Sequence, residues 1–107
     1  MTTAKVKLTN GNIKNSHFYL TSCLSMFPAE SVGGRNKFEQ GRKLLKIKPL
    51  GDEVIETDID GTKNIFRKRG WVTSMFKRAN AKEGDHVFLK KHEDDTYHVW
   101  VESAGTI

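Results

Sequence analysis

The sequence has little of the chemistry that staples small proteins or anchors them in membranes. Its 107 residues include one cysteine and two prolines. A single cysteine excludes an intramolecular disulfide and a cysteine-rich zinc site, and it suits a reducing compartment. No apolar run approaches the roughly 20 residues of a membrane span, and residues 1–5 lack the apolar core of a signal peptide. We therefore expect one soluble, cytoplasmic domain over residues 1–107.

Catalytic and metal-binding patterns are also missing. The four histidines, His17, His86, His92 and His98, do not have the spacing of metal ligands. The acids near Asp60 lack the Asp…Glu-x-Lys arrangement of nucleases, and there is no phosphate loop, dinucleotide fingerprint or nucleophile–base pair. These absences predict a binding module without metal or cofactor, and not an enzyme.

Positive charge is concentrated in two blocks of the chain. Residues 1–51 and residues 63–91 each contain nine Lys and Arg against two acids, whereas residues 52–62 contain five acids and no base. The formal net charge is +5. If the fold joins the two blocks, they form a surface that attracts phosphate, with steep salt dependence because counterions are released on binding. The alternative is that both blocks are only the solvated faces of strands.

Alternation of apolar and polar residues predicts many short strands. The predicted strands lie at residues 5–9, 17–20, 45–48, 54–57, 64–68, 86–90 and 97–101. Apolar residues at helical spacing predict one short helix over residues 20–27 and another over residues 71–79. Because strands dominate, we expect a mainly β fold whose sheet closes fully or partly into a barrel, which removes exposed edges.

The order of these elements, together with several short motifs, produces a resemblance. The motifs are Lys7-Leu8-Thr9, Phe18-Tyr19-Leu20, Phe27-Pro28, Arg69-Gly70-Trp71-Val72-Thr73-Ser74-Met75-Phe76 and Glu83-Gly84-Asp85-His86-Val87. Nearly the whole chain resembles the B3-type DNA-binding pseudobarrel of plant transcription factors and of restriction endonuclease recognition domains of the EcoRII type. The most specific part is the Gly-Trp helix followed by Gly-Asp and a strand. The resemblance implies a seven-stranded open β-barrel (pseudobarrel) with two short α-helices.

The resemblance also implies that two loops enter the major groove of double-stranded DNA. The first loop would supply Asn10, Asn12, Lys14, Asn15, Ser16 and His17. The second loop, residues 57–64, would supply Asp58, Asp60, Thr62, Lys63 and Asn64. The first loop has suitable chemistry, because an asparagine amide matches an adenine edge and a lysine suits guanine or phosphate. The alternative is an ordinary polar turn, since Asn-Gly is common in turns.

The second loop departs from the family because it is acidic. Glu56, Asp58 and Asp60 would repel phosphate, and three explanations are open. A carboxylate accepts a hydrogen bond from cytosine N4, or the acids pair with nearby bases and orient them toward DNA, or the segment is a solvated acidic turn. The bases available for pairing are Lys63, Arg67 and Arg69. Lys63 and Asn64 are the better candidates for direct contact.

Basic residues outside the two loops are further candidates. Lys46 and Lys48 lie on the polar face of a strand, where they either line a concave DNA-binding surface or protect an edge strand from aggregation. Alternation sends Arg67 and Arg69 to one face of their strand and Lys68 to the other. The remaining candidates for phosphate contact, in the Gly-rich segment, are Arg35, Lys37 and Arg42.

We therefore predict sequence-selective binding of double-stranded DNA. The protein would act as the recognition module of a restriction–modification system, with a nuclease or methyltransferase partner, or as a small regulator. The alternative is a protein-interaction module that recruits an enzyme or effector subunit through the acidic loop. Single-strand binding is disfavoured, because only Tyr19, Trp100 and Phe38 lie off the predicted core stripes and stacking needs exposed aromatics.

Overall fold

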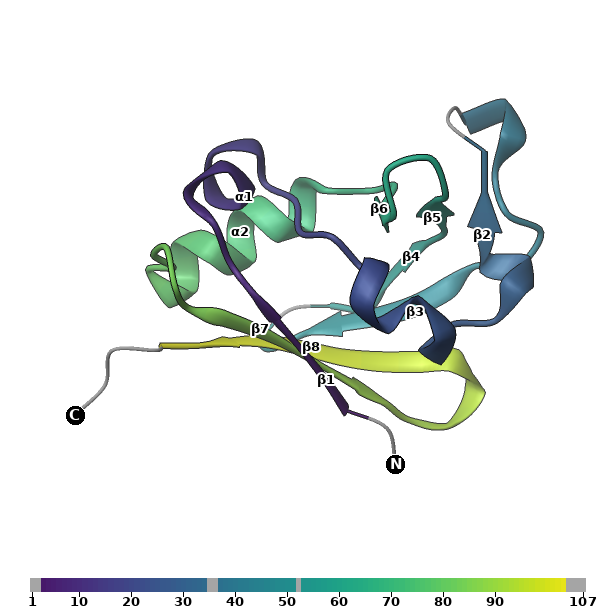
Figure 1. The fold of residues 1–107 in the computed structure, drawn as a ribbon. Coiled ribbons are helices and arrows are strands. Elements are labelled where there is room, and N and C mark those ends of the chain that lie inside the picture. The colour runs from purple at the N-terminus through teal and green to yellow at the C-terminus, as the bar shows by residue number, and fades with distance from the viewer. Residues whose placement is uncertain (1–2, 35–36, 52, 104–107) are drawn as a thin grey trace.

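The structure, a computed structural model, describes residues 3–34, 37–51 and 53–103. These residues form a mixed α/β arrangement of eight strands in two open sheets with short helices (Figure 1). The strands are β1 (Thr3–Lys7), β2 (Val32–Gly33), β3 (Leu45–Pro49), β4 (Ile55–Thr57), β5 (Ile59–Asp60), β6 (Ile65–Phe66), β7 (His86–Lys91) and β8 (Thr96–Glu102). The α-helices are α1 (Asn10–Asn15) and α2 (Gly70–Ala79). The 3₁₀ helices are η1 (Thr21–Met26), η2 (Ala29–Ser31), η3 (Lys37–Glu39) and η4 (Glu93–Asp95).

The larger sheet has the strand order β1-β7-β8-β3-β4. Its strands β7 and β8 form an antiparallel hairpin, and β3 runs parallel to β8. Alternate side chains of these strands point into the core, because successive residues of a strand face opposite sides. The inward residues are Leu45, Ile47, Val87, Leu89, Tyr97 and Val99. They confirm the strands predicted over residues 45–48, 86–90 and 97–101.

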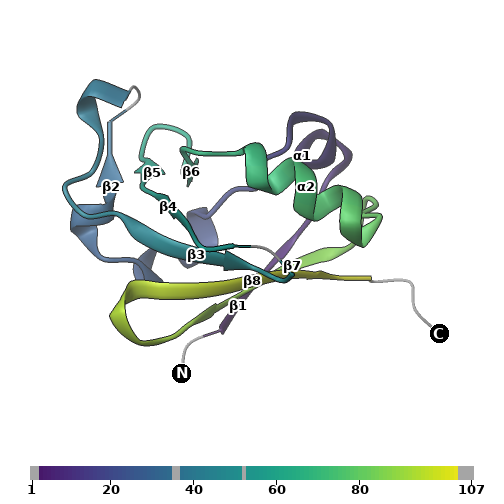
Figure 2. The same ribbon diagram turned by 180° about the vertical axis from the view of Figure 1, so that it is seen from behind.

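Helix α2 and the smaller sheet lie on one side of the larger sheet (Figures 1 and 2). The smaller sheet has the order β2-β5-β6. Helix α2 packs against β8 and buries one apolar stripe, which confirms the helix predicted over residues 71–79. The buried residues of that stripe are Trp71, Val72, Met75 and Phe76.

An aromatic cluster joins the smaller sheet to the rest of the core. The ring centroid of Phe66, on β6, lies 5.8 Å from Phe18, 5.8 Å from Phe27 and 5.5 Å from Trp71. Tyr97 of the larger sheet lies 4.7 Å from the same Phe27 ring. Aromatic contacts of this kind contribute about 0.5–1.5 kcal/mol each beyond simple area burial. The two sheets therefore share one core.

The first predicted loop is a helix and not an extended turn. Thr9 caps α1, since its Oγ1 accepts a hydrogen bond from the N–H of Asn12 at 3.1 Å. Asn12 Oδ1 accepts in return from the N–H of Thr9 at 2.9 Å. This reciprocal capping box satisfies two backbone donors and starts a helical turn. Helix α1 ends at Ser16, whose φ of 53° is left-handed.

The number and the positions of the strands and helices also differ in part from the prediction. The described residues form eight strands in two open sheets, and they do not close into a barrel. Residues 17–20 contain no strand, because the chain turns at Leu20, with a ψ of 7°, into η1. The helix predicted over residues 20–27 is a 3₁₀ segment kinked at Cys23, whose φ of −129° is not helical.

Candidate nucleic-acid interface

The segment that follows the first predicted loop lies against the β5–β6 turn, which is part of the second predicted loop. The backbone N–H of Leu20 donates to the carbonyl of Asn64, in the β5–β6 turn, at 2.7 Å. Nδ2 of Asn64 also donates to Oγ1 of Thr21 at 3.2 Å, across 43 positions of sequence. Helix α1 and the β5–β6 turn stand on the same side of the larger sheet (Figure 1). The fold therefore joins the first basic block to the second, which was the condition for a shared surface that attracts phosphate.

Cationic side chains meet where these segments join. Nη1 of Arg69 lies 3.4 Å from Nδ1 of His17, and the ring of Tyr19 lies 5.1 Å from the His17 ring. Burial lowers the pKa of His17 below its ordinary value, and the positive charges of Arg69 and Lys63 lower it further. An arginine can only donate, so the contact favours a neutral His17 that accepts at Nδ1. We call His17, Tyr19, Lys63 and Arg69 the cationic surface.

Tyr19 is the member of this surface that we did not predict as a contact. Its side chain is 48% exposed, whereas Phe18 and Leu20 on either side are buried. The alternation of this segment was visible in the sequence and placed Tyr19 on the solvent side. An exposed aromatic ring beside two cations offers a flat apolar surface and a hydroxyl to a ligand.

A cleft beside α1 extends the positive surface toward α2. Lys14 and Lys77 line the cleft, which has a volume of about 470 Å³. Oγ1 of Thr73, on α2, donates to Oγ of Ser16 at 2.7 Å and ties the end of α1 to α2. Ser16 is thus engaged within the protein, while Lys14 is exposed. Lys77 was missed because its position in the last turn of α2 was interpreted only as complementing the helix dipole.

The asparagines of α1 do not all face solvent. Asn12 is 4% exposed and serves as the capping residue of its own helix, so its expected contact with a base edge is wrong. Asn15 is exposed, although its Nδ2 donates to the carbonyl of Gly11 at 3.0 Å. Asn10 is exposed as well. The side chains of α1 that remain accessible for a ligand are therefore those of Asn10, Lys14 and Asn15.

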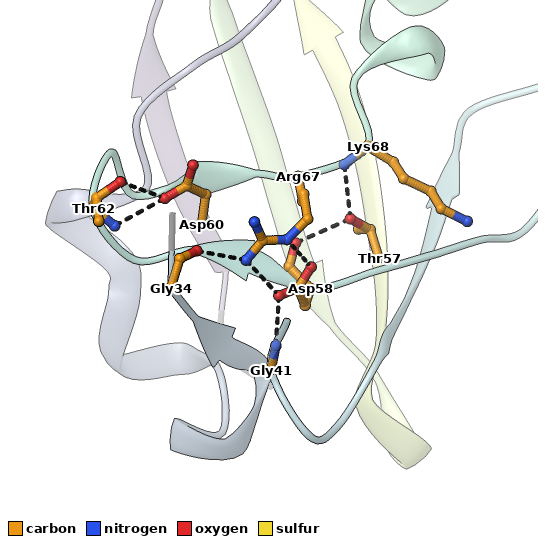
Figure 3. Close-up of polar contacts among 8 residues, drawn as sticks. All are labelled: Gly34, Gly41, Thr57, Asp58, Asp60, Thr62, Arg67 and Lys68. Atoms are coloured by element: carbon orange, nitrogen blue, oxygen red, sulfur yellow. Dashed lines mark hydrogen bonds and ion pairs between the residues drawn. The ribbon is translucent and has the colours of Figure 1, made fainter. Parts of the chain in front are cut away.

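Asp58 is inside the protein, in an ion pair with Arg67 (Figure 3). Asp58 is 2% exposed and Arg67 16% exposed. Arg67 donates from Nε to Oδ1 at 2.7 Å and from Nη2 to Oδ2 at 2.9 Å, and the N–H of Gly41 donates to Oδ2 at 2.7 Å. Hydrogen bonding to the Asp58 carboxylate is the main cause that raises the pKa of Arg67. Of the three explanations for the acidic loop, pairing with a base applies to Asp58.

The ion pair points inward, which corrects the expectation that Asp58 and Arg67 contact DNA. Nη2 of Arg67 also donates to the carbonyl of Gly34 at 2.7 Å. The pair therefore holds the segments on either side of η3 against the open end of the β5–β6 hairpin, where Asp58 precedes β5 and Arg67 follows β6 (Figure 3). Alternation had grouped Arg67 with Arg69, but β6 ends at Phe66, so the strand pattern does not extend to either residue.

Asp60 shapes the turn that presents Lys63. Its Oδ1 accepts from the N–H of Thr62 at 3.0 Å and from the Thr62 hydroxyl at 2.6 Å. Burial acts to raise the pKa of Asp60, but these bonds, the N–H of Lys63 and the charge of Arg67 lower it below its ordinary value. Asp60 is 7% exposed, so its expected base contact is also wrong. Thr62 and Lys63 are exposed at the tip of the turn.

The hairpin lies close against β2 because position 61 has no side chain. A Cβ on Gly61 would lie 2.7 Å from the carbonyl oxygen of Gly33 and 2.8 Å from Cγ1 of Val32. The N–H of Gly61 donates to that carbonyl at 3.0 Å. The Asp-Gly pair that predicted a turn thus also permits this backbone contact.

Several predicted contacts lie elsewhere on the protein. Lys46 and Lys48 are on the side of β3 opposite to the buried Leu45 and Ile47, away from the cationic surface. The structure therefore does not join them to the two loops. Arg42 is exposed just before β3. Arg35 and the side chain of Lys37 lie outside the described residues.

The described residues contain neither a metal-binding cluster nor a membrane-spanning helix. In the described part of the chain, no three or more His, Cys, Asp and Glu residues are grouped so as to hold a metal ion. Over the same residues, no helix is both long enough and apolar enough to cross a bilayer. Comparisons with protein-family models, curated proteins and solved structures give no match to this chain. Function must therefore be inferred from the chain's own geometry.

Proposed function

We propose that this protein binds double-stranded DNA with sequence selectivity, through the cationic surface and the exposed side chains of α1. The observation that carries the proposal is the 3.4 Å contact between His17, at the end of the first predicted loop, and Arg69, in the second basic block. The positive charge of Lys63 acts on the same group, since it lowers the pKa of His17 together with Arg69. Such a cluster is favourable for a ligand that brings negative charge to it.

The side chains divide between the two tasks of DNA recognition. Lys63 and Lys14 are flexible point charges that suit phosphate, which sets affinity and register. Arg69 can donate two bonds to O6 and N7 of guanine, and the amides of Asn10 and Asn15 can match adenine. His17 can accept or donate according to its protonation state. Selectivity would come from the second group of residues.

The acidic segment does not oppose this proposal. Asp58 and Asp60 are buried: Asp58 is paired with Arg67, and the Asp60 carboxylate accepts hydrogen bonds from Thr62, while Lys63 is exposed to a phosphate. The alternative of an acidic docking loop loses its main support for the same reason. The role as recognition module beside a nuclease or methyltransferase, or as a small regulator, is part of our proposal.

A B3-type pseudobarrel is the fold that we propose within this mixed α/β arrangement. Two observations support it: both sheets pack around one aromatic core, and α1 and the β5–β6 turn project to one side. Segment 17–20 lies next to the β5–β6 turn through the hydrogen bond from the N–H of Leu20 to the carbonyl of Asn64. An experimental structure with bound DNA would test the assignment through the position of the duplex.

The experiment is a salt series of duplex-binding measurements with matched variants. We expect Lys63→Ala and Arg69→Ala each to weaken duplex binding, and loss of a phosphate contact to reduce the salt slope by about 1. Lys46→Ala, an exposed lysine on the opposite side, is the control and should bind as the parent does. Equal effects of Lys46→Ala and Lys63→Ala would show only a general charge effect and would refute the proposed site.

A further inference from the structure

A second surface lies on the other side of the larger sheet. Alternation turns one set of side chains from β1, β7, β8 and β3 away from the core. We call this set the outer sheet face: Lys5, Lys7, His86, Phe88, Lys90, His98, Trp100, Lys46 and Lys48. Helices α1 and α2 and the smaller sheet lie on the opposite side of the larger sheet (Figures 1 and 2). The proposed duplex-binding site therefore does not use this face.

The aromatic residues of the outer sheet face form a pair. The strand register places Lys5 opposite Phe88, and Phe88 opposite Trp100. The rings of Phe88 and Trp100 are stacked, with centroids 5.6 Å apart and planes inclined by 11°. Both side chains are partly exposed. Nε1 of Trp100 donates to Glu102 at 2.8 Å, which fixes the orientation of the indole.

Lysines surround this pair in neighbouring rows of the sheet. One row aligns Lys90 with His98, and His98 with Lys48. Another places Lys7 opposite His86. The pKa of His98 is lowered by burial first, and then by the charges of His92, Lys48 and Lys90. The face is therefore positive around its aromatic centre.

Acids are few on this side of the described sheet. By alternation, five lysines share the face with two glutamates, Glu56 and Glu102, which lie at its margins. A second copy of this chain would meet the same excess of lysine, so repulsion opposes pairing of two such faces. A negatively charged partner matches the face better.

We propose that the outer sheet face binds single-stranded nucleic acid, with bases stacking on the Phe88–Trp100 pair and phosphates contacting the surrounding lysines. A parallel aromatic pair provides a stacking surface for unpaired bases of any sequence, and lysines follow the backbone. An acidic peptide would use the lysines but not the rings. In a duplex the bases already stack on one another, so the rings would gain little.

This inference corrects the expectation that too few aromatics were available for stacking. Phe88 was counted with the core because it lies between the apolar residues Val87 and Leu89. The structure turns Val87 and Leu89 inward and Phe88 outward. The inference does not depend on the proposed duplex binding, because the two surfaces share no residue.

The test is binding of a fluorescent oligothymidylate of about 12 nucleotides, measured by anisotropy with the full chain. We expect Phe88→Ala and Trp100→Ala each to weaken binding by about 5- to 150-fold, the range for loss of one stacked base. Trp100→Phe should retain most of the affinity, since the ring remains. Lys5→Ala should reduce the salt slope by about 0.7. Phe38→Ala removes an exposed aromatic that belongs to neither proposed surface and should have no effect.

Three results would overturn the inference. One is parent-like binding by Phe88→Ala and Trp100→Ala, with folding verified by circular dichroism. Another is loss of oligothymidylate binding in Arg69→Ala, which would place the strand on the cationic surface. The third is an affinity for polyglutamate that exceeds the affinity for oligothymidylate, which would make an acidic peptide the better occupant of this face. The parent protein could fail to bind any duplex while Phe88→Ala and Trp100→Ala still weaken single-strand binding. That result would refute the proposed function and support this inference.

Discussion

Replacing Arg67 by methionine should destabilise the protein more than any surface substitution. Arg67→Met keeps an apolar stem of similar length but removes the guanidinium that donates to Asp58 and to the carbonyl of Gly34. The Asp58 carboxylate is 2% exposed. Of the hydrogen bonds described above, it would keep only the one from the N–H of Gly41. A buried charge left without its partner costs about 3–5 kcal/mol.

The expected loss lies near the lower end of that range. Arg67 retains 16% exposure, so water can partly replace its charge after a small rearrangement. We therefore expect a loss of about 3 kcal/mol in the free energy of unfolding, a large part of the about 5–15 kcal/mol typical of a domain. With a urea dependence of about 1–3 kcal/mol per molar, the unfolding midpoint should fall by about 1–3 M.

The assay is equilibrium urea unfolding of four proteins: the parent, Arg67→Met, Asp58→Asn and the double variant. Two residues that interact directly should give losses that are less than additive in the double variant. The matched control is Arg69→Met, because Arg69 is an exposed arginine close to Arg67 in sequence. This variant should change the urea unfolding midpoint little. A loss below about 1 kcal/mol for Arg67→Met, or full additivity in the double variant, would refute the role of the ion pair.

Three further predictions concern the cap, the histidine and the turn. Asn12→Ala should lower the free energy of unfolding by about 1 kcal/mol, because the N–H of Thr9 loses its acceptor Oδ1, yet leave the preferred DNA sequence unchanged in a binding selection. Burial, Arg69 and Lys63 lower the pKa of His17, and a bound phosphate should favour its protonated form. Duplex affinity should therefore rise as the pH falls from about 7.5 to about 5.5. His17→Gln should remove this rise. The pKa of Asp60 in the folded protein is below its ordinary value of 3.8. Ionised Asp60 therefore stabilises the folded state above pH 3.8, and this contribution is lost as the pH falls through the lower folded value. Asp60→Asn should lessen this acid sensitivity in unfolding scans.

The parts of the fold governed by local pattern could be predicted from the sequence. Strands β3, β7 and β8 alternate apolar and polar residues clearly, and the apolar stripe of α2 has helical spacing. Helix α1 was missed because its capping box uses Asn12 at the position where glutamate or glutamine is usual. Residues 17–20 alternate like a strand, but the turn at Leu20 ends the extended backbone.

The charge pattern showed two basic blocks, but it determined neither whether they meet nor how the acids between them are used. The pairing of Asp58 with Arg67 depends on tertiary contacts with Gly34 and Gly41, which alternation along one strand does not contain. The face occupied by Phe88 was also undetermined, because every residue from 87 to 89 is apolar. In both cases the deciding interaction is between segments distant in sequence.

The most direct measurement is a selection of bound duplexes from a random pool, followed by affinity measurement of the enriched sequence. Our account predicts that the parent enriches one motif, binds it more tightly than a scrambled duplex in the presence of competitor DNA, and loses this preference in Arg69→Ala. No enrichment, with negligible affinity for every duplex at low salt, would contradict the proposed function.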